Sequence, residues 1–246
     1  MKRKKHIDGI LAEWPFDPRD VSARVCQGGD GREVLQLRVD MGLLQMETSG
    51  RPDGSRPHGM ETYFDHLIAQ AAAAGDEFVL SPDDCLEVDR EFTQFYHRRI
   101  CWLKLQCYEA AVNDADHTLA LMDFCQRHSP DDRWTISHEQ YRPFVLFHRT
   151  QASALAKLEL DGAEPAVHEI NRGLEQLRQF LRDRDLEEQF DEDEFARRLT
   201  DLRESLRREY DVGRTLQEQL ADAVAAEEYE LAARLRDEML RRGWAH

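Results

Sequence analysis

Two arginines and a histidine in a stretch rich in glycine and proline are the side chains of this sequence best suited to hold an anion. Residues 50–59 contain three glycines and two prolines, which favour a loop over a helix or strand. Guanidinium and imidazole groups beside such a backbone can bind phosphate or carboxylate. The candidate anion-binding residues are Arg51, Arg56 and His58. The alternative, which the composition favours, is a surface loop whose glycines and prolines only fix its turns.

Other patterns that carry chemistry are weak or missing from the sequence. Gly28, Gly29 and Gly31 have neither the spacing of a phosphate-binding loop nor a helix after them. No two cysteines are separated by two residues, and no His-Glu-x-x-His run occurs. Cys101 and Cys107 are typical of thiols packed in a helical core. We therefore predict no metal, no cofactor and no enzymatic activity, and an enzyme that uses the Arg51–His58 loop is the alternative.

Composition narrows the classes of partner. The chain has 246 residues, with 33 Lys and Arg against 49 Asp and Glu, so its formal net charge is -16. Phosphate contacts supply most of the non-specific affinity for nucleic acids, so direct nucleic-acid binding by the surface as a whole is not expected. There is no apolar run of membrane-spanning length. Five cysteines without close pairs fit reduced thiols, and we expect a cytoplasmic protein.

The first part of the sequence, residues 1–59, predicts a small antiparallel β meander. Residues 33–39 alternate apolar and polar, which is the period of a half-buried strand, and Leu35, Leu37 and Val39 are expected to face the core together. Strands at residues 21–26 and 43–48 can pair with this segment across turns. Before them, Trp14, Pro15, Phe16 and Pro18 suggest an extended, anchored entry segment.

Almost everything after residue 59 predicts helix, so the fold class is mainly α. Ser81-Pro82-Asp83-Asp84 is a strong helix start, because it combines an N-cap oxygen, a proline in the first turn and acids near the positive end of the dipole. Residues 129–133 interrupt the pattern, and the acidic run from Asp183 to Glu194 is typical of a solvated junction. The expected helices are 60–74, 82–105, 106–127, 137–159, 164–184, 187–210, 214–226 and 228–242.

A weak internal repeat suggests that the body, residues 60–211, is tetratricopeptide-like. In such repeats a small residue early in the second helix lets two helices approach closely, and Ala111 and Ala166 would have this role. They are 55 positions apart, against a period of about 34 residues, so an insertion around residues 129–143 is required. A generic helical bundle stays as the alternative.

The last segment, residues 212–246, predicts a hairpin of two short amphipathic helices. Leu216, Leu220, Ala223 and Val224 share one face of the first helix. Residues 225–228 form the turn, and Tyr229, Ala232, Ala233, either Leu235 or Arg236, and Met239 share a face of the second helix. Glu230 with Arg234, and Glu238 with Arg242, have the spacing of supporting ion pairs. Because helices of this length are marginal in water without further contacts, the hairpin is expected to seek a partner.

This segment resembles the UVR motif. The run from Tyr229 to Asp237, Tyr-Glu-x-Ala-Ala-x-Leu-Arg-Asp, matches the motif in order, and the resemblance covers about 30 residues. The motif is shared by UvrB and UvrC of nucleotide excision repair, a Clp ATPase and the activator of a protein arginine kinase. There it is a helical hairpin that mediates protein-protein contact. By resemblance, the partner-binding residues would be Leu216, Leu220, Tyr229, Glu230, Ala232, Ala233, Leu235, Arg236 and Asp237.

The function expected from these patterns is that of an adaptor. A helical scaffold would present the UVR hairpin to a protein partner, which the resemblance places among Clp, arginine-kinase or excision-repair components, or to a second copy in a homodimer. An accessory factor of nucleotide excision repair that binds through the hairpin is the alternative. Direct nucleic-acid binding and membrane binding are not expected.

Overall fold

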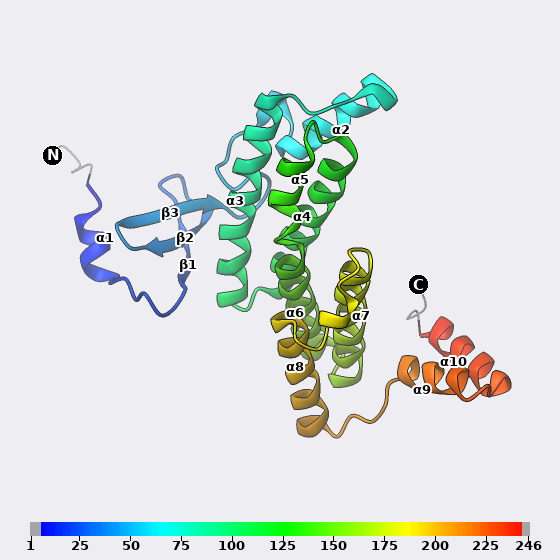
Figure 1. Cartoon of the computed structure of the whole chain (residues 1–246). Helices are drawn as coiled ribbons and strands as arrows, with labels where there is room; N and C mark the ends of the chain where they lie inside the picture. The colour runs from blue at the N-terminus through cyan, green and yellow to red at the C-terminus, as the bar shows by residue number, and fades with distance from the viewer. Residues whose placement is uncertain (1–5, 243–246) are drawn as a thin grey trace. The chain divides into compact units, whose positions relative to one another are not determined.

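The computed structural model describes residues 6–242 and divides the chain into two compact units, Met1–Arg149 and Thr150–His246. Helices dominate both units, as Figure 1 shows. The described elements of the first unit are α1 (Asp8–Glu13), β1 (Ser22–Gln27), β2 (Glu33–Val39), β3 (Gly42–Glu47), η1 (Pro57–Gly59), α2 (Tyr63–Ala74), η2 (Gly75–Glu77), α3 (Pro82–Lys104), α4 (Tyr108–His128) and α5 (Asp132–Glu139). Helix α6 (Arg142–Leu160) crosses the boundary, and α7 (Ala163–Arg182), η3 (Glu187–Gln189), α8 (Glu194–Tyr210), α9 (Leu216–Ala225) and α10 (Tyr229–Arg241) follow.

The predicted fold class is confirmed: the chain is mainly helical, with an N-terminal antiparallel meander and a C-terminal helical hairpin. Ala111 and Ala166 are fully buried, as close helix packing requires. The tetratricopeptide assignment of the body and the three-part division at residues 59 and 211 stay predictions. No helix in the described part of the chain is long and apolar enough to span a bilayer.

The sheet has the strand order β1-β2-β3, with β2 in the centre. Leu35 pairs with Val25 on one side and with Met46 on the other. Leu35 and Leu37 are buried as predicted, whereas Val39 at the end of the strand is only half-buried. The polar residues between them, Gln36 and Arg38, are buried as well. Strand β2 is therefore covered on both faces, although its alternating sequence is typical of a strand with one solvated face.

The second face of β2 is covered by the N-terminal segment. Arg38 Nε donates to the Trp14 carbonyl oxygen at 2.8 Å, and the Arg24 guanidinium lies 4.3 Å from the centre of the Trp14 ring. The cation–π contact and the hydrogen bond hold this segment against the sheet. Residues 15–17 have no regular structure, but residues 18–20 form a turn, in which Asp20 N donates to the Asp17 carbonyl oxygen at 3.4 Å, so the entry segment is not extended throughout as predicted. The helix α1 before it was not expected either, because six residues are too few for a clear helical period.

Local capping signals define the helices of the first unit. Ser81 accepts a hydrogen bond from Asp84 N while the Asp84 carboxylate accepts from Ser81 N, so the predicted start of α3 is confirmed as a capping box. Helix α2 begins with the same device at Thr62 and Asp65, three residues later than expected. It ends at Gly75, whose φ of 70° suits glycine. The expected break at residues 129–133 is shorter than predicted, because Asp131 caps α5 there, and the predicted helix 137–159 begins only at Arg142 as α6.

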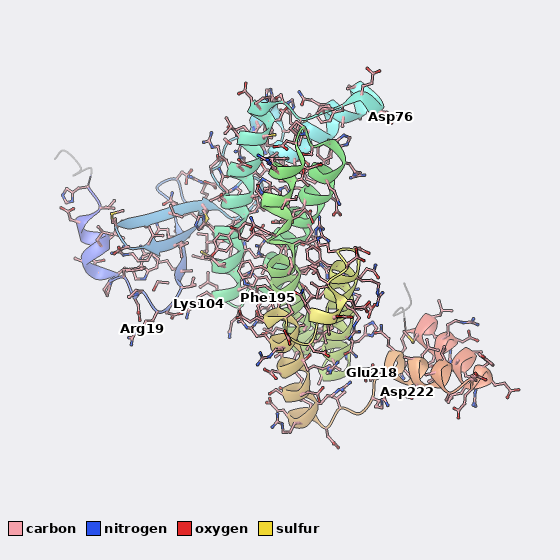
Figure 2. The ribbon with its side chains drawn as sticks, viewed as in Figure 1. Arg19, Asp76, Lys104, Phe195, Glu218 and Asp222 are labelled. Atoms are coloured by element: carbon pink, nitrogen blue, oxygen red, sulfur yellow. The ribbon has the colours of Figure 1, made fainter. Side chains whose placement is uncertain are left out.

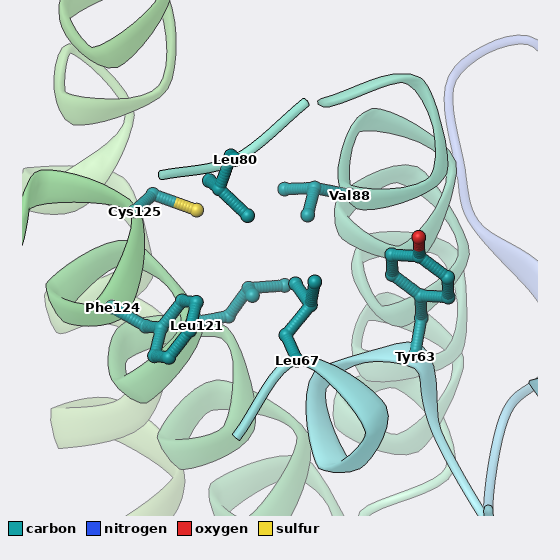
Figure 3. Packing of buried hydrophobic residues seen from close by; sticks show 7 residues of the cluster. All are labelled: Tyr63, Leu67, Leu80, Val88, Leu121, Phe124 and Cys125. Carbon is teal, nitrogen blue, oxygen red and sulfur yellow. The ribbon is translucent and has the colours of Figure 1, made fainter. Parts of the chain in front are cut away.

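An apolar cluster joins α2, α3 and α4. Figure 3 shows its buried members packed against one another: Tyr63, Leu67, Leu80, Val88, Leu121, Phe124 and Cys125. Trp134 of α5 packs on the same cluster. These helices are therefore held by burial of apolar surface, which is the dominant favourable contribution to folding.

A buried carboxylate, Glu91 of α3, organises the polar part of this unit. It is fully buried and accepts hydrogen bonds from Tyr63 N at 2.8 Å and Phe64 N at 3.1 Å, so it satisfies free amides at the start of α2. His117 Nε2 lies 3.0 Å from the same carboxylate, and Arg51 Nε lies 3.5 Å away. Glu91 thus joins α2, α3, α4 and the loop before α2.

The second unit is built on α7 and α8. Both carry apolar residues at helical spacing that become buried, among them Val167, Ile170 and Leu174 of α7 and Leu199 of α8. Helices α6 and α7 approach closely at Gly173, where an added Cβ would lie 2.7 Å from the Cβ of Thr150. The predicted helix 187–210 begins only at Glu194, because Asp193 caps it after the 3-10 turn η3.

Candidate functional site

The C-terminal hairpin consists of α9 and α10, joined by a turn at residues 226–228. Glu227 occupies the left-handed region with φ of 60°, and the Glu228 N–H donates to the Ala223 carbonyl oxygen at 2.7 Å, so the chain reverses within three residues. The turn falls where the sequence predicted it. Of the two predicted ion pairs, Glu238 with Arg242 forms at 2.8 Å, whereas no ion pair joins Glu230 and Arg234 in the structure.

The seam between the two helices is narrow. Its buried residues are Ala223 of α9 and Ala232 and Met239 of α10. Leu216, Leu220, Leu231 and Leu235 are half-buried around them. Small residues at the centre let the two backbones come close, and only one large apolar side chain, Met239, is fully buried there. The hairpin therefore depends on further contacts for its stability.

Large apolar side chains remain on the outside of the hairpin. Val224 is 54% exposed, Tyr229 68% and Leu240 58%. Among the residues singled out from the sequence, Ala232 packs in the seam, Leu216, Leu220 and Leu235 are half-buried, and the exposed ones are Tyr229, Glu230, Ala233, Arg236 and Asp237. Arg236 pairs with its neighbour Asp237 at 3.0 Å. The motif residues thus separate into a packing group and an outward group. The prediction that Val224, Tyr229 and Ala233 line the packing faces is wrong, because these side chains are exposed.

A polar seat holds the start of α9 against α7 and α8. Thr215 is 1% exposed and caps α9 in a capping box with Glu218. Its hydroxyl oxygen also accepts from Asn171 Nδ2 of α7 at 3.3 Å, and the Asn171 carbonyl oxygen accepts from Arg203 Nη1 of α8 at 3.0 Å. One threonine therefore fixes both the first turn of the hairpin and its attachment.

Charged groups complete the seat. Glu218, labelled on α9 in Figure 2, accepts from Arg207 of α8, and Arg242 Nη1 at the far end of α10 lies 3.3 Å from Glu164 of α7. Partial burial opposes ionisation of Glu218, but hydrogen bonds from Arg207 and the Thr215 backbone outweigh it and hold its pKa below the usual range. The carboxylate is therefore ionised at neutral pH. Arg207 Nε and the Gln217 side-chain oxygen are buried without a hydrogen-bond partner, so the seat is not fully satisfied.

The seat was not predicted from the sequence. Thr215-x-x-Glu218 is a capping-box signature, so the position of Thr215 could have been recognised. Asn171, Arg203 and Arg207 have no such signal, because their roles depend on contacts with residues 11 to 44 positions away.

Replacing Thr215 with alanine is expected to weaken the attachment of α9 by about 1–2 kcal/mol, because the cap and the Asn171 hydrogen bond are lost together. Hydrogen exchange followed by mass spectrometry should show lower protection of residues 215–225, with α7 unchanged. Thr93→Ala is a matched control, since that exposed hydroxyl donates only to the Asp89 carbonyl of its own helix. Equal protection in both variants would mean that the seat does not hold the hairpin.

The loop at residues 50–59 does not present free basic side chains, because both of its arginines lie beside glutamates. The Arg51 side chain is 3% exposed and pairs with Glu87 at 2.8 Å. Arg56 is exposed and lies 3.3 Å from Glu61. His58 has φ of 50° and stacks on His66, with ring centres 3.8 Å apart. The charge of Arg51 is therefore already matched within the protein.

A hollow of about 590 Å³ lies beside this loop, lined by Arg51, Arg56, His58 and His66. The carboxylates of Asp83, Asp84 and Glu87 line it too. Partial burial, followed by the neighbouring His58, lowers the pKa of His66. The acidic groups oppose an anion, so the geometry gives the anion-binding prediction no support. In the part of the chain that the structure describes, no three His, Cys, Asp or Glu side chains form a group suited to a metal ion.

These features define a helical chain that ends in a seated two-helix hairpin with exposed apolar residues. Residues 214–241 match the family model described as the UvrB/uvrC motif, so the resemblance noted in the sequence is shown for this segment. The matched segment begins one residue before the capping Thr215 and ends with α10. No curated protein and no solved structure matches the chain.

Proposed function

We propose that this protein is an adaptor whose C-terminal hairpin binds another protein, that the helical remainder is a scaffold, and that the chain is not an enzyme. One observation carries the proposal. Val224, Tyr229 and Leu240 lie exposed on a segment that matches the UvrB/uvrC motif.

The energetics of the hairpin support a binding role. Burial of apolar surface contributes about 25 cal/mol per Å², and a tyrosine adds ring contacts and a hydroxyl that can hydrogen-bond. Tyrosine is also enriched among the residues that dominate protein-protein binding energies. Tyr229 begins α10 directly after the turn, so a partner can reach it without disturbing the buried seam.

The seat supports the same proposal because it gives the hairpin a defined base. Thr215 and Glu218 are held by Asn171 and Arg207, and these contacts leave Tyr229 exposed. A binding element that is ordered before it meets its partner loses less conformational entropy on binding.

Replacing Tyr229 with alanine is expected to weaken capture of the partner about thirtyfold or more, equivalent to about 2 kcal/mol, because truncation of a central tyrosine removes one of the dominant contacts of an interface. The measurement is recovery of proteins from native cells with tagged full-length protein, quantified by mass spectrometry. Folding should be unchanged, since the side chain is 68% exposed. Leu160→Ala is the control, because Leu160 is 70% exposed in the same unit but outside the hairpin. Recovery of the same proteins in the same amounts with Tyr229→Ala would refute the adaptor proposal.

A second candidate is an accessory role in nucleotide excision repair, favoured by the description of the matched family model. In this case the captured proteins would be repair components, whereas Clp or arginine-kinase components would indicate a role in protein turnover. Contact with damaged DNA would then come through the partner, because a net charge of -16 disfavours direct binding.

A further inference from the structure

The turn end of the hairpin carries acidic side chains without ionic partners. Glu227, Glu228 and Glu230 are exposed, and their carboxylates form no ion pair with any residue from 6 to 242. They surround Tyr229, and Val224 lies just before them on α9. This end of the hairpin therefore combines exposed apolar groups with unmatched negative charge.

The rest of the hairpin differs in charge balance. Arg214 is paired with Asp222 at 2.9 Å, and Arg241 with Glu238 at 2.6 Å. Arg242 is paired with both Glu238 and Glu164. Arg234, one helical turn beyond Glu230, is exposed and offsets only part of the negative charge. The unmatched charge is thus negative and lies around Tyr229.

This charge distribution favours one kind of binding partner at the turn end of the hairpin over another, a basic protein segment over a second copy of the chain. Two copies that met turn to turn would place three unpaired glutamates of each chain against those of the other, and like charges in contact disfavour association. A partner with basic groups around an apolar centre would instead cover Tyr229 and match the glutamates, with positive and negative patches complementary as in most specific interfaces.

We infer that Val224 and Tyr229, with Glu227, Glu228 and Glu230, form a docking surface for a basic amphipathic protein segment with an apolar centre. This inference rests on the proposed function and specifies the partner's chemistry. The apolar pair supplies burial, while the glutamates favour basic partners and exclude acidic ones.

The test uses two fluorescent helical peptides of equal length and equal apolar residues. One carries Lys and Arg beside its apolar stripe, and the other carries Glu and Asp. Anisotropy titrations with the full chain are expected to show at least tenfold tighter binding of the basic peptide, and this preference should fall as salt is raised. The triple variant Glu227→Gln, Glu228→Gln, Glu230→Gln should lose about tenfold in affinity for the basic peptide, and Tyr229→Ala should weaken binding further.

The matched control removes the same charge elsewhere. The control variant neutralises three exposed acids between α7 and α8, with the substitutions Glu188→Gln, Asp191→Asn and Glu192→Gln. Its affinity for the basic peptide should stay within twofold of that of the parent chain. Equal binding of both peptides, no detectable binding of the basic peptide, or equal losses in the two triple variants would overturn the inference. So would a dimer in sedimentation that Tyr229→Ala dissociates. If only the partner chemistry is wrong, Tyr229→Ala still weakens capture of the cellular partner, whereas failure of the proposed function leaves that capture unchanged.

Discussion

Glu91→Ala is expected to lower the free energy of unfolding of the first unit by about 3–5 kcal/mol, the range for breaking a buried charged network by removal of one partner. The carboxylate is fully buried, accepts from Tyr63 N and Phe64 N, and lies 3.0 Å from His117 Nε2. Alanine would leave two amides at the start of α2 without an acceptor and would remove one of the carboxylates beside buried Arg51.

Hydrogen exchange with mass spectrometry is the appropriate measurement, because it reports on each unit separately in a chain that need not unfold in one step. Protection should fall most in α2 and in the loop that carries Arg51. Glu77→Ala is the control, since Glu77 is exposed and surface changes of this kind stay within about 0.5 kcal/mol. If Glu91→Ala lowers the free energy of unfolding by less than about 1 kcal/mol, the Glu91 carboxylate does not hold α2, α3, α4 and the Arg51 loop together as described.

The second large effect concerns the contact between α6 and α7. Gly173→Ala is expected to destabilise the second unit by about 2–3 kcal/mol, even though alanine is the better helix former. The added Cβ would overlap the Thr150 hydroxyl oxygen and methyl group and lie 2.7 Å from its Cβ. A rotation of the Thr150 side chain can move its hydroxyl and methyl groups but not its Cβ, so the clash can be relieved fully only by moving one helix away from the other.

A double-variant cycle separates steric overlap from a general effect of the substitution. Thr150→Gly removes the overlapping atoms, and its buried hydroxyl oxygen has no hydrogen-bond partner to lose. Adding Gly173→Ala to Thr150→Gly should therefore cost almost nothing in thermal unfolding of the chain. Gly213→Ala is the control, because no atom lies within 4 Å of its added Cβ. Additive losses in the cycle would exclude close packing as the cause.

Features set by neighbouring residues were predicted well. The start of α3 follows from Ser81 and its capping box, the meander from the alternation around Leu35, and the hairpin from its own motif. In each case the determining interactions lie within a few positions along the chain or between adjacent strands. Helix limits were less accurate where a short turn interrupts the pattern, as at η3 before Asp193.

Features set by distant residues were missed. Glu91 accepts from amides 27 and 28 positions away, and Asn171 reaches Thr215 across 44 positions. A glutamate or asparagine within a helix carries no pattern that reveals such a partner. The partners of Arg51 were missed for the same reason. The composition of its loop suggested a free cation, whereas two glutamates of α3 lie beside its guanidinium.

The polar contacts of the seat also determine how separable the hairpin is from the rest of the chain. Its anchoring at α7 and α8 relies mainly on one threonine, one asparagine and a few ion pairs, and the segment that matches the family model coincides with the physical hairpin. Deletion of the hairpin would therefore leave no large apolar surface exposed on α7 and α8. Attachment of the same hairpin to another helical protein would need only a few hydrogen-bonding groups on that protein.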